Sequence, residues 1–183
     1  MNVAVCDYGA GNTRSVVAAL SRLDVDVTLT ADPQAITSAE LAVLPGVGSA
    51  RSAMDALCQR GLDQALRARA DGGKQTLGIC LGLQLALEWS DEDGGVECLG
   101  ILPGRAERLT QGHIPRMGWA LVEPWRQAFY FAHSYAAKTP AATATSDGIV
   151  AAAENKAFLG VQFHPEKSGP AGQEFLRQCL TRV

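Results

Sequence analysis

A cysteine flanked by glycines is the feature of this sequence that most directly suggests chemistry. It lies in Gly78-Ile79-Cys80-Leu81-Gly82, where a strand-like apolar run gives way to a helix-like one. A sharp strand-to-helix turn strains its central residue, and glycines two positions away leave room for the neighbouring backbone. The turn places Cys80 at a helix N-terminus, where free N–H groups and the helix dipole favour a thiolate. The motif predicts a nucleophilic cysteine, with a buried structural cysteine as an equal alternative on this motif alone.

A histidine and a carboxylate two residues apart could serve such a nucleophile. His164 and Glu166 flank Pro165 and follow the apolar run Leu159–Phe163. On an extended segment residues i and i+2 point to the same side, and doubly wound sheets place their ligands at strand ends. We therefore predict that His164 accepts the thiol proton and returns it to the leaving group, while Glu166 orients the imidazole. A surface histidine beside a turn proline is the alternative.

A glycine-rich turn after another apolar run could complete the site. The turn contains Gly46, Val47 and Gly48, and it follows Leu41–Leu44. Its backbone N–H groups, together with that of Leu81, could stabilise an oxyanion. An ordinary strand–helix loop and a phosphate-cradling turn are the alternatives. A nucleotide P-loop is not supported, because the sequence has no Gly-Lys-Ser/Thr.

These residues need a scaffold, and the first half of the chain is typical of alternating strands and helices. Such alternation implies a parallel sheet with helices on both faces. The expected strands are Asn2–Cys6, Val25–Thr30, Leu41–Leu44 and Gln75–Ile79, and the expected helices are Asn12–Leu23, Ala50–Ala70 and Leu81–Trp89.

The pattern changes after Ser90. A polar loop over 91–95 leads into short segments broken by glycine and proline, which predict an antiparallel patch that continues the sheet. The fold class is therefore a single α/β domain over residues 1–183, with a mostly parallel central sheet flanked by helices and an added antiparallel portion. The later expected strands are Ile101–Leu102, Trp119–Val122, Phe129–Ala132, Thr143–Thr145, Ile149–Ala153 and Leu159–Phe163, and the last expected helix is Ala171–Leu180.

Composition and charge exclude several classes of function. The 183 residues suffice for one domain, and a net charge of −3 gives no basic field for nucleic acid. No apolar run approaches the ~20 residues of a membrane span, and the N-terminus lacks signal-peptide features, so we expect a cytoplasmic protein without membrane contacts. The five cysteines are scattered, which argues against a metal site or a disulfide framework. The turn Gly9-Ala10-Gly11 lacks the third glycine of a dinucleotide-binding loop.

Six segments in this order resemble the class I, triad-type glutamine amidotransferases. Within that group the chain is similar to the glutaminase subunits of imidazole glycerol phosphate synthases, and the matching segments cover nearly the whole chain. The resemblance implies a flavodoxin-like, class I amidotransferase fold. The segments are Asp7–Asn12, Pro45–Gly48, Leu77–Leu85, Pro115–Trp119, Tyr130–Tyr135 and Gln162–Gly169.

The resemblance implies a specific reaction. Glutamine would be hydrolysed to glutamate and ammonia through a Cys80 thioester, without a cofactor. The ammonia would pass to a cyclase partner, the TIM-barrel subunit HisF, in a heterodimer of histidine biosynthesis. A related glutaminase that supplies another acceptor, such as a sugar, is the alternative.

The resemblance also implies a glutamine-binding set. Gln84, Ser134 and Tyr135 match positions that hold the substrate in the family. Gln84 further lies one helical turn beyond Cys80, and its amide offers both a donor and an acceptor. A solvated helix residue is the alternative for Gln84.

A segment of the second half matches the part that the family presents to the cyclase. Met117 and Trp119 lie in it, and an exposed aromatic there would suit an interface anchor. A core tryptophan is the alternative. The chain departs from the family pattern in the same segment, with Arg116 where histidine is usual and Ala120 where asparagine is usual.

Overall fold

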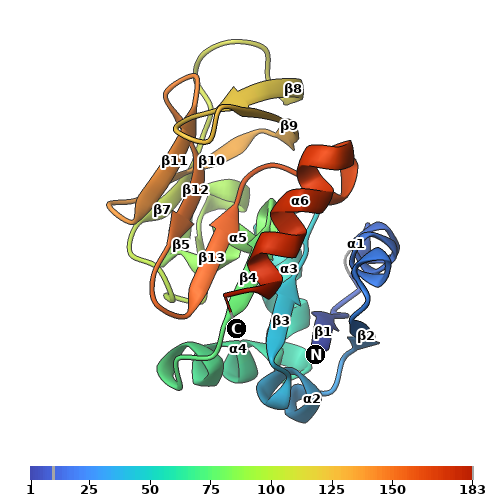
Figure 1. Ribbon diagram of the computed structural model, residues 1–183. Coiled ribbons are helices and arrows are strands. Elements are labelled where there is room, and N and C mark those ends of the chain that lie inside the picture. Colours follow the sequence, from blue (N-terminus) through green and yellow to red (C-terminus); the bar gives the residue numbers. More distant parts are fainter. Residues whose placement is uncertain (10, 183) are drawn as a thin grey trace.

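A seven-stranded sheet forms the centre of the computed structural model, which describes residues 1–9 and 11–182 (Figure 1). Its strand order is β11-β12-β13-β4-β3-β1-β2, and the five strands from β13 to β2 are mutually parallel. β11 and β12 continue the sheet in the antiparallel sense. The strands are β1 (Asn2–Cys6), β2 (Asp26–Thr30), β3 (Leu41–Leu44), β4 (Thr76–Ile79), β11 (Ala142–Ser146), β12 (Ile149–Glu154) and β13 (Phe158–Val161).

Helices cover both faces of this sheet, as the alternating pattern predicts. Along β1, Val3 and Val5 pack in the core beneath α1 and α6, whereas Ala4 and Cys6 pack beneath α2, α3 and α4. The alternation follows from the period-2 geometry of a strand, which sends successive side chains to opposite faces. The helices are α1 (Thr13–Leu20), α2 (Pro33–Ser38), α3 (Ala50–Gln59), α4 (Leu62–Asp71), α5 (Leu81–Ala86) and α6 (Gly169–Leu180).

Two expected helices were too long. The helix expected over Ala50–Ala70 is two helices, α3 and α4, because Gly61 adopts a left-handed φ of 69° between them. The helix expected over Leu81–Trp89 ends at Ala86, and the chain then becomes extended. The predictions were too long because the helical spacing of apolar residues continues past the point where each helix ends.

The antiparallel patch is only partly a continuation of the sheet. A separate four-stranded sheet has the order β10-β7-β5-β6, and a hairpin of β8 and β9 stands alone as a two-stranded sheet (Figure 1). The expectation of a strand at Ile101–Leu102 is wrong, because these residues form a bend. The additional strands are β5 (Trp89–Ser90), β6 (Val96–Glu97), β7 (Arg105–Arg108), β8 (Arg116–Val122), β9 (Gln127–His133) and β10 (Tyr135–Lys138).

No helix among the described residues is long and apolar enough to span a membrane. The same part of the chain contains no group of three or more His, Cys, Asp or Glu residues arranged to hold a metal ion.

Candidate active site

Cys80 occupies a strained turn between β4 and α5. Its φ of 54° and ψ of −106° are unfavourable for a residue with a side chain. A Cβ on Gly82 would overlap the Leu44 carbonyl oxygen, and a Cβ on Gly78 would lie 2.9 Å from the Gly82 backbone. A side chain would therefore not fit at either glycine. This steric requirement is the basis on which the sequence motif predicts a nucleophile at Cys80.

His164 and Glu166 form a buried pair next to this turn. The His164 Nδ1 lies 2.8 Å from the Glu166 Oε1, and the two side chains are 2% and 0% exposed. The structure brings the two side chains together, but the expectation that both lie on one extended segment is wrong. Glu166 does not lie on an extended segment; it belongs to a 3₁₀ turn, η3 (Pro165–Lys167), which follows β13 and brings the carboxylate back beneath the imidazole.

Backbone contacts fix His164 from two sides. Its N–H donates to the Tyr130 carbonyl of β9 at 2.8 Å, and its carbonyl accepts from the buried Ser168 hydroxyl at 2.6 Å. The Ser168 oxygen in turn accepts from the Tyr130 N–H at 3.0 Å. These three bonds join β9 to the segment that carries the histidine.

His164 holds a proton more tightly than an ordinary histidine. Burial opposes its charged form, but hydrogen bonds and charge interactions with Cys80 and Glu166 outweigh burial and raise the His164 pKa to about 9. An imidazolium beside a sulfur stabilises its thiolate form. The sequence analysis predicts that His164 accepts the thiol proton, and a raised His164 pKa favours a histidine that holds this proton.

A cavity of about 200 Å³ opens at the sulfur. His164 and Glu166 do not line it; they adjoin it through the hydrogen bond between His164 and Cys80. Cys80 and most of the predicted binding residues line it. Gly46 is the exception, because its Cα packs against Tyr8 and Leu81 beside the cavity. The lining residues are Val47, Gly48, Cys80, Leu81, Gln84, Glu92, Pro115, Ala132, His133, Ser134 and Tyr135.

The predicted oxyanion residues surround the sulfur side of the cavity. Leu81 is the first residue of α5, and the first N–H groups of a helix have no acceptor within it. Gly48 adopts a φ of 101°, a conformation that favours glycine. Tyr8 anchors this loop, since its hydroxyl donates to the Pro45 carbonyl at 2.7 Å. The loop can therefore present backbone donors where an oxyanion would form.

Gln84 is buried, so it is not a solvated helix residue. Its Nε2 donates to the Tyr135 carbonyl at 2.8 Å and to the Gln162 Oε1 at 3.1 Å. Both donor hydrogens are thereby used within the protein, and only the Gln84 carbonyl oxygen is left for a ligand. The Gln162 Nε2 lies 3.6 Å from the Cys80 sulfur and can donate to a thiolate.

Sequence reasoning missed three further residues around this cavity. Gln162 is fully buried against Cys80, and Glu92 brings a carboxylate to the cavity wall while accepting from the Ala50 N–H at 2.7 Å. Asn12 donates its Nδ2 to the Glu166 Oε1 at 2.5 Å. Only Gln162 carried a local signal, since it lies two residues before His164, just after β13.

The two predicted interface residues lie outside the cavity. Met117 and Trp119 are 64% and 59% exposed on β8, and Leu121 continues the same face. Trp119 pairs with Tyr130 across the hairpin, with ring centroids 6.3 Å apart. Trp119 is therefore a surface residue, which rules out a core position for it.

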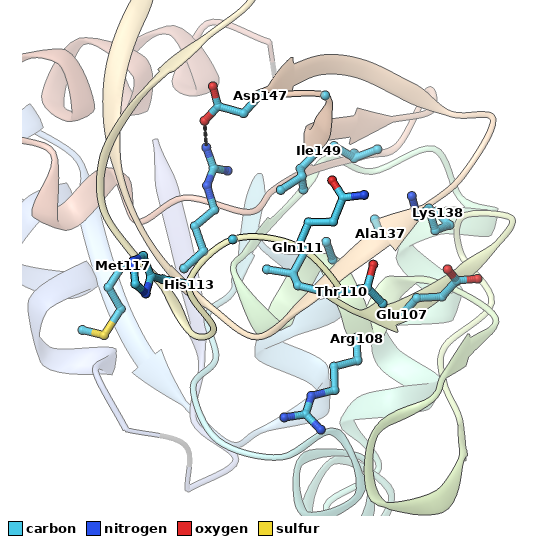
Figure 2. Close-up of a pocket in the computed structure, with 16 residues that line it drawn as sticks. Glu107, Arg108, Thr110, Gln111, His113, Met117, Ala137, Lys138, Asp147 and Ile149 are labelled. Carbon is cyan, nitrogen blue, oxygen red and sulfur yellow. Dashed lines mark hydrogen bonds and ion pairs between the residues drawn. The ribbon is translucent and has the colours of Figure 1, made fainter.

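A larger cavity of about 610 Å³ lies beyond the loop that precedes β8. Figure 2 shows the Gln111 side chain directed toward Ile149, while Arg108 points away from both. The ion pair between Arg116 and Asp147, at 2.7 Å, closes one side of the cavity. This cavity contains neither Cys80 nor His164, so its size does not make it the reaction site.

The fold is shared with known glutamine amidotransferases. A crystal structure of a glutamine amidotransferase matches with a TM-score of 0.84 and 18% identity, covering 98% of this chain and 97% of that one. The structure of PurLQS from Thermotoga maritima matches with a TM-score of 0.72, 18% identity and coverage of 98% and 97%. At such identities these matches establish the fold.

Sequence comparison is more specific. The model of the family "Glutamine amidotransferase class-I" matches residues 4–183. Imidazole glycerol phosphate synthase subunit HisH of Methylococcus capsulatus is 43% identical, covering 98% of this chain and 95% of the relative. The HisH subunit of Methanothermobacter thermautotrophicus is 41% identical, with 97% of each chain covered. The chain therefore belongs to the class I glutamine amidotransferases and, within them, to the HisH family.

Proposed function

We propose that this chain is the glutaminase subunit of an imidazole glycerol phosphate synthase, with Cys80 as nucleophile and His164 and Glu166 completing the triad. The observation that carries the proposal is a strained cysteine turn that lines a small cavity and whose Cys80 is hydrogen-bonded to the buried His164–Glu166 pair. Family membership supports the assignment of glutamine as the substrate.

The first half of the reaction forms a thioester. The Cys80 thiolate attacks the carbonyl carbon of the glutamine side-chain amide, and the carbonyl π electrons move to oxygen. Backbone N–H groups of Leu81 and of the Val47–Gly48 turn stabilise the resulting oxyanion. The intermediate collapses as His164 gives its proton to the nitrogen, so that the C–N bond breaks, ammonia leaves and a γ-glutamyl thioester remains.

The second half releases glutamate. His164, now neutral, takes a proton from a water molecule, whose oxygen attacks the thioester carbonyl. The C–S bond then breaks, glutamate departs, and the thiolate and the imidazolium are restored. Glu166 stays ionised throughout, holding the imidazole by its Nδ1 so that Nε2 faces the reaction.

Substrate recognition follows from the polar groups of the cavity wall. The Glu92 carboxylate suits the α-ammonium group of glutamine, and the free carbonyl oxygen of Gln84 can accept a further hydrogen bond. Ser134 and Tyr135 contribute the opposite wall. Burial raises the Glu92 pKa, and the Asp93 charge adds to this effect, while the hydrogen bond from the Ala50 N–H opposes it. A bound cation would therefore stabilise the ionised Glu92 carboxylate.

The ammonia needs an acceptor, and the exposed apolar face of β8 supports a protein partner. We assign this face, defined by Met117, Trp119 and Leu121, to the cyclase subunit HisF in a cytoplasmic heterodimer. Large exposed apolar side chains in one stripe are typical of interfaces.

The proposal is tested by glutamate release from glutamine, measured with the chain alone and with its cyclase subunit. We expect release to depend on the cyclase and to vanish in Cys80→Ala. Cys98→Ala is the matched control, because Cys98 is also buried but lies away from the His–Glu pair. Unchanged release in Cys80→Ala would overturn the nucleophile, and equal release without the cyclase would overturn the coupling.

A further inference from the structure

Asn12 makes a contact that the reaction scheme does not use. It stands immediately before α1 with a φ of 72°, in the left-handed region. A residue in this place often caps the helix, but the Asn12 side chain makes no capping hydrogen bond to α1. It instead donates its Nδ2 to the Glu166 Oε1 at 2.5 Å, across 154 positions of sequence.

We propose that Asn12 is a positioning residue that holds the Glu166 carboxylate in the orientation that His164 requires. The inference rests on the proposed function, since it assigns a role relative to the triad. It adds a fourth residue, from the first turn of the chain, to a site otherwise built from the β4–α5 turn and the segment after β13.

The hydrogen bonds of Glu166 show why such an anchor is needed. Its Oε1 accepts from both Asn12 and His164, at 2.5 and 2.8 Å. Its Oε2 is buried and has no hydrogen-bond partner among the described residues. Without the Asn12 amide, the bond to His164 would be the only hydrogen bond to this carboxylate among the described residues, and the carboxylate could rotate about its last side-chain bond. Asn12 therefore fixes the plane of the carboxylate relative to the imidazole.

The left-handed backbone at position 12 does not by itself explain why the residue there is asparagine. Glycine adopts this conformation at no steric cost, and asparagine is merely tolerated there. Since the side chain is turned toward Glu166 and away from α1, the amide is the part of the residue with a separate role. A charge-assisted hydrogen bond of this kind contributes more than a neutral one.

The effect should be visible at His164. The titratable groups that act on it are Cys80 from the β4–α5 turn and Glu166 from its own turn. His133, at the end of β9, faces it and has its own pKa lowered by the His164 charge. Loosening Glu166 weakens the interaction that favours the imidazolium, while Cys80 and His133 stay in place. The His164 titration should then shift toward the ordinary histidine value of about 6.5.

The test compares Asn12→Gly with Asp24→Gly. Both residues are left-handed, and Asp24 is exposed at the far end of the segment that begins at Asn12. In complex with the cyclase subunit, we expect Asn12→Gly to lower kcat for glutamate release about 10- to 100-fold with KM within about twofold. The NMR titration of His164, one of three histidines, should move downward in the same variant. Asp24→Gly should behave like the parent.

A parent-like kcat and His164 titration in folded Asn12→Gly would overturn the inference. If that variant fails to fold, Asn12→Asp keeps the shape of the side chain but turns a carboxylate toward Glu166. A folded Asn12→Asp with parent-like kcat would equally overturn it. Cys80→Ala in the same assay tests the proposed function independently, since its loss of activity supports the glutaminase assignment whatever Asn12→Gly does. A failure of the Asn12 inference can thus be distinguished from a failure of the proposed function.

Discussion

Two buried histidines beside one cavity have opposite charge behaviour. His133, at the end of β9, has a pKa lowered to about 4, chiefly by burial and further by the Arg116 and His164 charges, against a hydrogen bond with the Tyr135 carbonyl. His164, after β13, is buried to a similar degree but has a pKa raised to about 9. Burial pushes both toward the neutral form.

The difference lies in the partners that each ring meets. The Nδ1 of His133 lies 2.9 Å from a backbone carbonyl, and its Nε2 is buried without a partner among the described residues. His164 instead meets the Glu166 carboxylate and the Cys80 sulfur. An anionic partner thus reverses the effect of burial, and one ring becomes a proton carrier while the other stays a neutral part of the wall.

The largest expected change in kinetics comes from removing each histidine ring in turn, which should separate the two roles. We expect His164→Ala to lower kcat for glutamate release by about 10³-fold or more, since a proton-transfer group is lost. His133→Ala should act mainly on KM, because His133 lines the cavity but exchanges no proton in the scheme. Steady-state kinetics on both variants checks this. A kcat loss of equal size in the two variants would remove the distinction.

Neutralising the carboxylate should make His164 resemble His133. In Glu166→Gln the shape is kept while the charge is lost, so burial is opposed by Cys80 alone and the His164 pKa should fall. We expect kcat to drop by up to about 10⁴-fold, as when the carboxylate that orients a catalytic histidine is neutralised. NMR titration with kinetics is the measurement. Parent-like titration would show that Cys80 alone raises the His164 pKa against burial.

The two pKa shifts also predict opposite pH windows for stability. His164 has a raised pKa, so its contribution is complete below about 6.5 and is lost as pH rises through about 9, by at most about 3 kcal/mol. His133 has a lowered pKa, so its contribution is complete above about 6.5 and is lost as pH falls toward about 4. Urea unfolding across pH measures both. In His164→Gln the loss on the alkaline side should disappear; if it persists, another group causes it.

The smallest expected effect concerns Arg116. Its guanidinium lies 4.4 Å from the Phe131 ring centroid and pairs with the exposed Asp147. Arg116→Met removes a positive charge that disfavours protonated His133, so the His133 pKa should rise modestly. The change in unfolding free energy should be about 1 kcal/mol, since exposed ion pairs contribute little. A downward shift of the His133 titration would contradict the assigned cause.

The sequence predicted most reliably those features that depend on residues close together in the chain. The requirement for Gly78 and Gly82 around Cys80 is steric and holds within five residues, so it could be predicted. The pairing of His164 with Glu166 followed from their spacing, although a 3₁₀ turn rather than an extended strand brings them together. The alternation of the first half likewise predicted a parallel sheet covered on both faces.

The rest depends on contacts between distant segments. Asn12 reaches Glu166 across 154 positions, and this contact has no signature in the local pattern. Gln162 lies close to His164 in the sequence, but that closeness does not reveal its contact with Cys80 across 82 positions. The break at Gly61 depends on a left-handed conformation, which an apolar period does not reveal. The β8–β9 hairpin forms its own two-stranded sheet, joined to β11 of the main sheet by the bridge between Glu123 and Thr145, and this arrangement is likewise a matter of tertiary pairing.

The titration of the histidines in the unaltered chain tests the central claim most directly. Resonances of His133 and His164 can be assigned with single His→Gln variants and followed by NMR from acid to alkaline pH. We expect His164 to titrate near 9 and His133 near 4. If His164 titrates at or below the ordinary value of about 6.5, then Glu166 and Cys80 do not set the charge of His164, and the account of the triad is contradicted.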